Sequence, residues 1–420
     1  MAVMNLLSLA AIAIAGASAL QVPPAVPDEA AAHYERARTA ASGGDWERAR
    51  QEFVQALALR PRYLEARIEL ARAQVARREF DAAIASVSAA LEIDAKNIDA
   101  QLIRAAALIG QRRTDFALRL LEPLIAEHPQ NADVRFESGV VNLAAKRYPE
   151  AEAAFRKTWE LEPDNPRGLV GMAETRLARQ ERGPALELLQ AEVAKQPGRM
   201  DLHLALANIA LRVEQYDLAI REYEKAVPSL QGPVAGDAYA HLAEACRRKG
   251  DLESALAAAR KARELMPRNP LAAATLAMML DGAGRKEEAR QAYEAVLELD
   301  SGNAVALNNL AFLLAETGGD LKRALELAQK ARALLPASLD VQDTVGWIYL
   351  KANMTGEAAE LFRSLVEKQP DNAGFRYHLG AALAQQGDKA AAQEQLRQAL
   401  ARTKSAEEAG KIRALMRTLE

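Results

Sequence analysis

Residues 139–163 read GVVNLAAKRYPEAEAAFRKTWELEP, and the spacing of four residues in this stretch decides the fold. Gly139 is followed twelve residues later by Ala151, and then by Phe155 and Pro163. An alanine equivalent to Ala151 returns at steps of 34 residues, broken only by one step of 36 and one of 35. A period of this length predicts stacked supersecondary units rather than one globular core. The eleven recurrent alanines are Ala49, Ala83, Ala117, Ala151, Ala185, Ala219, Ala255, Ala289, Ala324, Ala358 and Ala392.

A second small residue stands twelve or thirteen positions before each of these alanines. Each unit therefore contains two short amphipathic helices, and the two small residues mark the place where the helices cross. Helix axes about 8–10 Å apart leave no room there for a long side chain. The residues of this second set are Ala37, Ala71, Ala105, Gly139, Ala173, Ala207, Ala243, Ala277, Ala311, Gly346 and Gly380.

Most units continue with a large apolar or aromatic residue four positions after the second-helix alanine, one turn along the same face. Proline ends the second helix in seven units, because it lacks an N–H and clashes with the preceding turn. Over residues 30–404 this pattern resembles the tetratricopeptide repeat (TPR) family. The resemblance implies an all-α fold, a right-handed superhelical solenoid of about eleven helix pairs.

The chain divides into segments where the period changes. Two extra residues fall within Val227–Gly236, a stretch rich in Pro and Gly that predicts a break in helix and a loosened joint between repeats six and seven. We therefore expect repeats one to six over residues 30–231 and repeats seven to eleven over residues 232–404. Residues 405–420 have a capping-box start and one apolar face, which predicts a helix that covers the end of the solenoid.

The amino terminus has a different character, since residues 1–27 contain no charged side chain. Residues 1–19 are mostly apolar and end in Ala17-Ser18-Ala19, which predicts a secretory signal peptide cleaved after Ala19. Residues 20–29 then form a Pro-rich linker. We expect a periplasmic or secreted protein, although the same segment is long enough for a retained inner-membrane anchor, and an apolar cap or a start-site artefact are further alternatives.

Composition and motifs argue against several classes of function. The formal net charge is −3, and no basic footprint for nucleic acid is evident. The basic pairs Arg77-Arg78, Arg112-Arg113 and Arg247-Arg248 are interpreted as solvated cations that complement the helix dipole near helix ends, and the alternative is a contact with phosphate. The chain has no Gly-rich phosphate loop, no zinc spacing and no nucleophile motif, and its single Cys246 is expected to be buried. We expect no catalytic residue, no cofactor site and no metal site.

The resemblance implies a concave surface lined by the first helix of each unit, and the last three units carry distinctive side chains there. Amide side chains hold the backbone of an extended peptide, and Trp and Tyr give a large contact area with a polar tip. This combination predicts a site for a peptide or a partner helix. The alternative is that the aromatic residues only fill space between adjacent first helices. The predicted partner-binding residues are Asn308, Asn309, Phe312, Asp343, Thr344, Trp347, Tyr377 and His378.

Two classes of function remain open from the sequence. The favoured one is a non-catalytic scaffold in the bacterial cell envelope that binds a protein or peptide ligand. We expect this protein to bind no nucleic acid, and to contact the membrane only through residues 1–19 if these are uncleaved. The other is a carrier or regulatory subunit for exopolysaccharide synthesis or export. Residues 308–316, 343–349 and 377–380 are similar to segments of TPR proteins from exopolysaccharide and protein-sorting systems.

Overall fold

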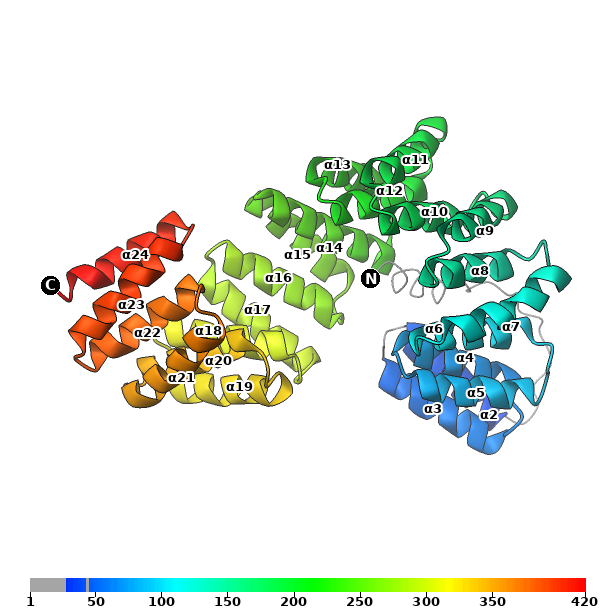
Figure 1. Ribbon diagram of the computed structural model, residues 1–420. Helices are drawn as coiled ribbons and strands as arrows, with labels where there is room; N and C mark the ends of the chain where they lie inside the picture. Colours follow the sequence, from blue (N-terminus) through cyan, green and yellow to red (C-terminus); the bar gives the residue numbers. More distant parts are fainter. Residues whose placement is uncertain (1–27, 43–44) are drawn as a thin grey trace. The chain divides into compact units, whose positions relative to one another are not determined.

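The computed structural model describes residues 28–42 and 45–420, and within these ranges the chain is helical with no strand. The helices follow one another as antiparallel pairs, and they fall into two compact units, the first ending at Ser229 and the second beginning at Leu230 (Figure 1). The predicted signal peptide or anchor (1–19) and most of the predicted linker (20–29) lie outside the described residues.

The described part of unit 1 contains six helix pairs, one for each of the first six repeats, and a short 3-10 helix. The helices are α2 (Glu29–Ser42), α3 (Trp46–Leu59), α4 (Leu64–Ala76), α5 (Phe80–Leu91), α6 (Ile98–Gly110), α7 (Thr114–Glu127), α8 (Ala132–Ala144), α9 (Tyr148–Leu161), α10 (Arg167–Ala178), α11 (Arg182–Lys195), α12 (Met200–Arg212), α13 (Tyr216–Ala226) and η1 (Val227–Ser229).

Unit 2 contains five helix pairs and a final single helix. The helices are α14 (Gly232–Lys249), α15 (Leu252–Leu265), α16 (Pro270–Gly282), α17 (Lys286–Leu299), α18 (Ala304–Glu316), α19 (Leu321–Leu334), α20 (Leu339–Lys351), α21 (Thr355–Lys368), α22 (Ala373–Gln385), α23 (Lys389–Arg402) and α24 (Ala406–Arg417).

The helix crossings are as tight as the sequence predicts. All eleven recurrent alanines of the second helices are fully buried. A methyl group added at Gly139 would lie 2.5 Å from the ring of Phe155, and one added at Gly346 would lie 2.7 Å from the ring of Phe362. The all-α repeat solenoid is therefore confirmed, and its apolar core consists of these crossings and the aromatic rings that pack beside them.

The stretch between repeats six and seven is more helical than its Pro and Gly content suggests. Only Leu230 and Gln231 separate η1 from α14. Pro233 lies in the first turn of α14, where the N–H that proline lacks would have no partner within the helix. Proline is therefore compatible with an early helix start at this joint.

The final helix α24 begins as its sequence indicates, with one difference. The Ser405 hydroxyl accepts a hydrogen bond from the Glu408 backbone N–H at 3.3 Å. The Glu408 carboxylate accepts from the Thr403 hydroxyl instead of the Ser405 N–H, so only half of a capping box forms. Ile412 on this helix and Leu419 after it are buried, which places the apolar side of the segment against the end of the repeats.

A recurring hydrogen bond fixes the loop before each of six first helices. The donor is the fourth residue of the repeat's first helix, and the acceptor is the carbonyl oxygen of the residue six positions earlier, which is a proline in five of the six loops. The donor–acceptor distances lie between 2.6 and 3.2 Å. The pairs are Arg67 with Pro61, Gln101 with Ala95, Arg135 with Pro129, His203 with Pro197, Gln342 with Pro336 and Arg376 with Pro370.

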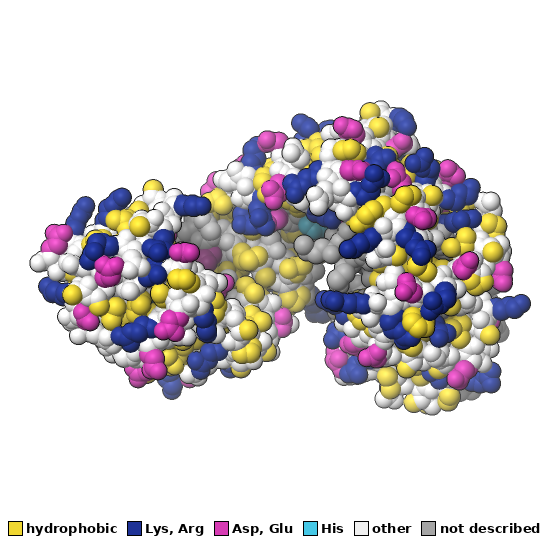
Figure 2. Space-filling view, viewed as in Figure 1, with side chains coloured by type: hydrophobic (Ala, Val, Ile, Leu, Met, Phe, Trp, Pro, Cys, Tyr) yellow, Lys and Arg dark blue, Asp and Glu magenta, His cyan; other side chains and the backbone are white. Residues whose placement is uncertain are grey.

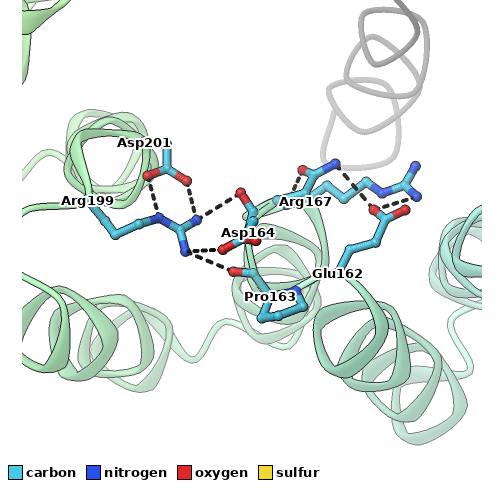
Figure 3. Close-up of polar contacts among 7 residues, drawn as sticks. Glu162, Pro163, Asp164, Arg167, Arg199 and Asp201 are labelled. Carbon is cyan, nitrogen blue, oxygen red and sulfur yellow. Dashed lines mark hydrogen bonds and ion pairs between the residues drawn. The ribbon is translucent and has the colours of Figure 1, made fainter. Parts of the chain in front are cut away.

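Repeat five has Leu169 at this position and satisfies its loop carbonyl differently. Arg199 from the next repeat donates to the Pro163 oxygen at 2.9 Å and to the Asp164 oxygen at 3.0 Å, while its Nε donates to Asp201 at 2.9 Å (Figure 3). Arg167 holds the other side of the same loop through Glu162, at 2.8 Å. The arginine pair thus ties repeats four, five and six together.

Candidate functional site

The eight predicted binding residues lie on three successive first helices of unit 2. Helix α18 carries Asn308, Asn309 and Phe312, helix α20 carries Asp343, Thr344 and Trp347, and helix α22 carries Tyr377 and His378. Helix α20 packs against both α18 and α22. We call this the first-helix face of unit 2, and we extend it to the equivalent positions Leu271 and Met278 on α16 and Val305 on α18.

The two asparagines are held by neighbours in the fold. The Asn309 side-chain amide donates to the Tyr293 hydroxyl at 2.9 Å, and the Asn309 oxygen accepts from Asn308 at 3.3 Å. Burial raises the pKa of Tyr293 to about 12, so its hydroxyl stays protonated at neutral pH. Asn308 Oδ1 has no hydrogen-bond partner among the described residues. That oxygen is itself buried, so the fold leaves it shielded from solvent.

Trp347 is packed between repeats, with only 8% of the residue exposed. Its indole N–H donates to Glu316 of the preceding repeat at 2.7 Å, and its ring lies 4.5 Å from the His378 ring of the next repeat. The Lys351 ammonium lies 4.7 Å from the Trp347 ring centroid and 3.5 Å from the Glu316 carboxylate. Trp347 thus joins three repeats, as the packing alternative describes, and offers little free surface to a ligand.

A second polar contact between side chains crosses from α20 to α22. The Asp343 carboxylate and the His378 ring are 2.7 Å apart, and both side chains are largely buried. Tyr377 lies beside this pair, half-buried, with ring centroids 6.5 Å from Trp347. Burial raises the pKa of the Tyr377 hydroxyl, which therefore remains a neutral donor and acceptor. The Asp343 and His378 side chains are therefore bonded to each other within the protein.

The structure also shows binding candidates that the sequence analysis missed. Leu271 is 71% exposed, Val305 is 50% exposed and Met278 is 40% exposed. Leu271 and Val305 occupy equivalent positions in repeats eight and nine, and Met278 is equivalent to Phe312. The sequence could have indicated these candidates. Leu271 and Val305 are large apolar residues at the second position of two successive first helices, where they have no buried partner to pack against.

The exposed side chains of the face are of kinds that suit the binding of a partner. The face combines exposed aliphatic side chains with a partly exposed Phe312. Within the described ranges no group of three His, Cys, Asp or Glu side chains is arranged to hold a metal ion. Among the helices of the described residues, none has the length and apolar character needed to span a bilayer.

Comparison with known proteins agrees with this architecture. A tetratricopeptide repeat family model matches residues 104–166, 204–270, 275–338 and 346–407, and a second tetratricopeptide repeat model matches residues 40–107. The chain belongs to the tetratricopeptide repeat family. TPR proteins commonly bind protein or peptide partners, and they act in general as scaffolds.

Two curated relatives match about half of this TPR chain. It is 27% identical over 224 residues to cellulose synthase operon protein C of Pseudomonas fluorescens (strain SBW25), covering 51% of this chain and 17% of that protein. It is 26% identical over 206 residues to the TPR repeat-containing protein PA4667 of Pseudomonas aeruginosa, covering 49% of this chain and 35% of that protein. The chain thus spans well under half the length of either relative.

Among solved structures, the chain is similar to one in the APC/C hetero-tetramer Cut9-Hcn1. The two share 16% sequence identity with a TM-score of 0.47, and the match covers 94% of this chain and 90% of that chain.

Proposed function

We propose that this chain is a non-catalytic scaffold that binds a segment of another protein on the first-helix face of unit 2. The observation that carries the proposal is the exposure of Leu271 and Val305 at equivalent positions of neighbouring first helices, together with that of Met278 on the same helix as Leu271. Large apolar side chains left in water on one surface mark a site of interaction. Full burial of one such side chain by a partner stabilises a complex by about 1.5–3 kcal/mol.

The shape of the expected ligand follows from the chemistry of the face. Glu316 forms an ion pair with Lys351, and the Asp343 carboxylate is bonded to the His378 ring, so no unpaired acidic group on this part of the face selects the ligand by charge. Apolar contacts therefore supply the affinity. This combination favours an amphipathic segment that lays its apolar side along α16 and α18.

The cell envelope is the proposed location. The support is the uncharged, apolar stretch at residues 1–19 with its small-x-small ending, which is the pattern of a secretory signal. Export would place the first-helix face of unit 2 among envelope proteins. Sequencing the amino end of the protein recovered from a periplasmic fraction tests this proposal, and a chain that begins at Met1 in the cytosol contradicts it.

A second candidate function has one specific observation in its favour. The name of the Pseudomonas fluorescens relative links that protein to a cellulose synthase operon. On this basis the chain would serve as a carrier or regulatory subunit in exopolysaccharide synthesis or export. A gel-shift of the exported polymer by the purified chain, in the absence of any protein partner, would favour this alternative.

Site-specific photo-crosslinking in cells tests the scaffold proposal directly. A photo-reactive phenylalanine analogue placed at Val305 or at Leu271 should crosslink to a discrete protein. The same analogue at Val54, which is 48% exposed on α3 in unit 1, is the matched control and should not give that product. The captured protein is then identified by mass spectrometry, and its binding is remeasured with purified components.

Charge substitutions complete the test. Leu271→Asp with Val305→Asp should abolish binding of the identified partner while the thermal unfolding midpoint stays near that of the wild type, because both side chains are exposed. Val54→Asp should leave binding unchanged. Equal crosslinking from all three positions, or binding that survives the double substitution, would contradict the proposal.

A further inference from the structure

Three successive repeats of unit 1 carry two adjacent cations in the turn between their helices. All six side chains are exposed, and only Arg77 forms an ion pair within the described part of the chain, with Glu79 at 2.8 Å. The three pairs are Arg77-Arg78, Arg112-Arg113 and Lys146-Arg147.

The fold places these turns along one edge of unit 1. The first helices α4, α6 and α8 pack against one another in order, so their carboxyl ends and the turns that follow them line up. We call this the basic edge. Figure 2 shows dark blue side chains gathered around a hydrophobic one over the region where Figure 1 draws α6 and α7. Acidic side chains on the same edge are fewer, and Asp81 accepts a hydrogen bond from Gln111.

One cation of each pair occupies a position that is unfavourable for the backbone of a residue other than glycine. Arg78, Arg112 and Lys146 have φ values of 66°, 62° and 60°, in the left-handed region that side chains other than glycine rarely adopt. The equivalent residue is a glycine in four repeats of unit 2, for example Gly284 with a φ of 73°. Because glycine would suit the turn better, the folding of the turn does not explain the basic residues.

An exposed aromatic side chain lies within the same edge. Phe116, near the start of α7, is 50% exposed. The guanidinium groups of Arg113 and Arg119 lie 4.4 Å and 4.6 Å from its ring centroid. A phenyl ring flanked by two cations matches the boundary of an anionic bilayer, where the ring reaches the acyl region and the cations meet phosphate groups.

We propose that the basic edge docks unit 1 on the surface of an anionic phospholipid bilayer. Charge complementarity and the exposed Phe116 support a lipid surface, and so does the uncharged apolar stretch at residues 1–27, which is compatible with delivery to a membrane. This proposal departs from the sequence-based expectation of membrane contact only through residues 1–19. It is independent of the ligand proposed for unit 2.

Vesicle sedimentation with the full chain tests the proposal. The full chain should bind vesicles of phosphatidylcholine mixed with phosphatidylglycerol more tightly than vesicles of phosphatidylcholine alone, and added salt should weaken the binding. The variant R112Q/R113Q/K146Q/R147Q should lower the partition coefficient by about 100-fold or more, because each cation near such a surface contributes substantially. Phe116→Ser should lower it by roughly tenfold without loss of stability.

The control variant removes four positive charges elsewhere in unit 1, as R62Q/K96Q/R156Q/K195Q. It should bind vesicles as the wild type does, and it also keeps any contribution of residues 1–27 constant. Equal losses in the two quadruple variants would overturn the proposal. It would also be overturned if the wild type bound single-stranded DNA as tightly as the mixed vesicles, or formed a salt-sensitive oligomer that the R112Q/R113Q/K146Q/R147Q variant does not form.

Discussion

A single buried carboxyl on α8 shows how strongly the local environment shifts the pKa of a side chain. Glu137 is 4% exposed, and its Oε1 has no partner among the described residues. Burial raises the pKa of this side chain to about 8, because the charged form loses its hydration. The folded chain therefore keeps a proton on Glu137 at neutral pH, whereas the unfolded chain releases it near the ordinary value for glutamate.

The consequence is a stability that falls as the pH rises. Between about pH 4.5 and pH 8 the folded state binds more protons than the unfolded state, so each step up in pH favours unfolding. Glu137→Gln should remove this dependence and stabilise the protein at pH 8 by about 3–5 kcal/mol, with little effect at pH 4.5. Urea unfolding of both proteins at the two pH values measures the difference.

Glu150→Gln is the matched control, since Glu150 is exposed near the start of the next helix. It should show no such trend with pH. A stabilisation by Glu137→Gln that is the same at pH 4.5 and pH 8 would show that Glu137 is not a buried protonated carboxyl.

At the scale of the helix pair, the turn between the two helices is a repeated source of strain. In every repeat whose turn is described, one residue has a positive φ, and in six repeats that residue is not glycine. The six are Arg78, Arg112, Lys146, Gln180, Glu214 and Asn353. A side chain in this conformation costs roughly 1–2 kcal/mol.

Lys146→Gly should therefore raise the free energy of unfolding by roughly 1 kcal/mol. The same substitution removes one cation of the basic edge, so it should stabilise the fold while weakening vesicle binding. Gly284→Ala provides the reverse change, because its φ is 73° and the space around the added methyl group is open. Thermal unfolding should move up for the first variant and down for the second, and shifts in the same direction would refute the strain argument.

The sequence predicts the helix pairs well and the turns poorly, for a physical reason. The requirement for small residues at a crossing is steric, so a small residue such as Ala151 recurs in every repeat. The left-handed turn tolerates residues such as Lys146 at a modest energetic cost, so it leaves no consistent residue type. Only the four glycines of unit 2 at this position hint at it.

The candidate site was predictable in position but not in detail. Its residues lie on the first helices that the repeat pattern indicates. The burial of Trp347, however, depends on Glu316, which is 31 residues earlier in the chain and bonds its indole N–H. The bond between Asn309 and Tyr293 likewise joins two repeats. Contacts between repeats depend on how the repeats pack, so the spacing of residues within one repeat does not predict them.

At the scale of the whole molecule, each repeat contacts mainly its neighbours. A destabilising substitution in one unit should therefore lower the stability of that unit first. A methyl group at Gly380 would lie 2.8 Å from Leu396 and 3.3 Å from the Ala392 carbonyl oxygen. Gly380→Val should destabilise unit 2 by about 1–3 kcal/mol through overpacking.

The three tryptophans allow each unit to be followed separately. Trp46 and Trp159 lie in unit 1, and Trp347 lies in unit 2. In variants that retain only one tryptophan, Gly380→Val should lower the denaturation midpoint reported by Trp347 more than the midpoint reported by Trp159. Equal shifts at both probes would show that the two units unfold as one.

The central claim is that the recurrent small residues are required by the helix crossings, and one pair of variants on a single helix tests it. Ala151 is fully buried at the crossing of α9, whereas Ala153 on the same helix is exposed. In equilibrium urea unfolding, Ala151→Leu should lose about 1–3 kcal/mol of stability, and Ala153→Leu should stay within about 0.5 kcal/mol of the wild type. Equal effects of the two substitutions would contradict the account.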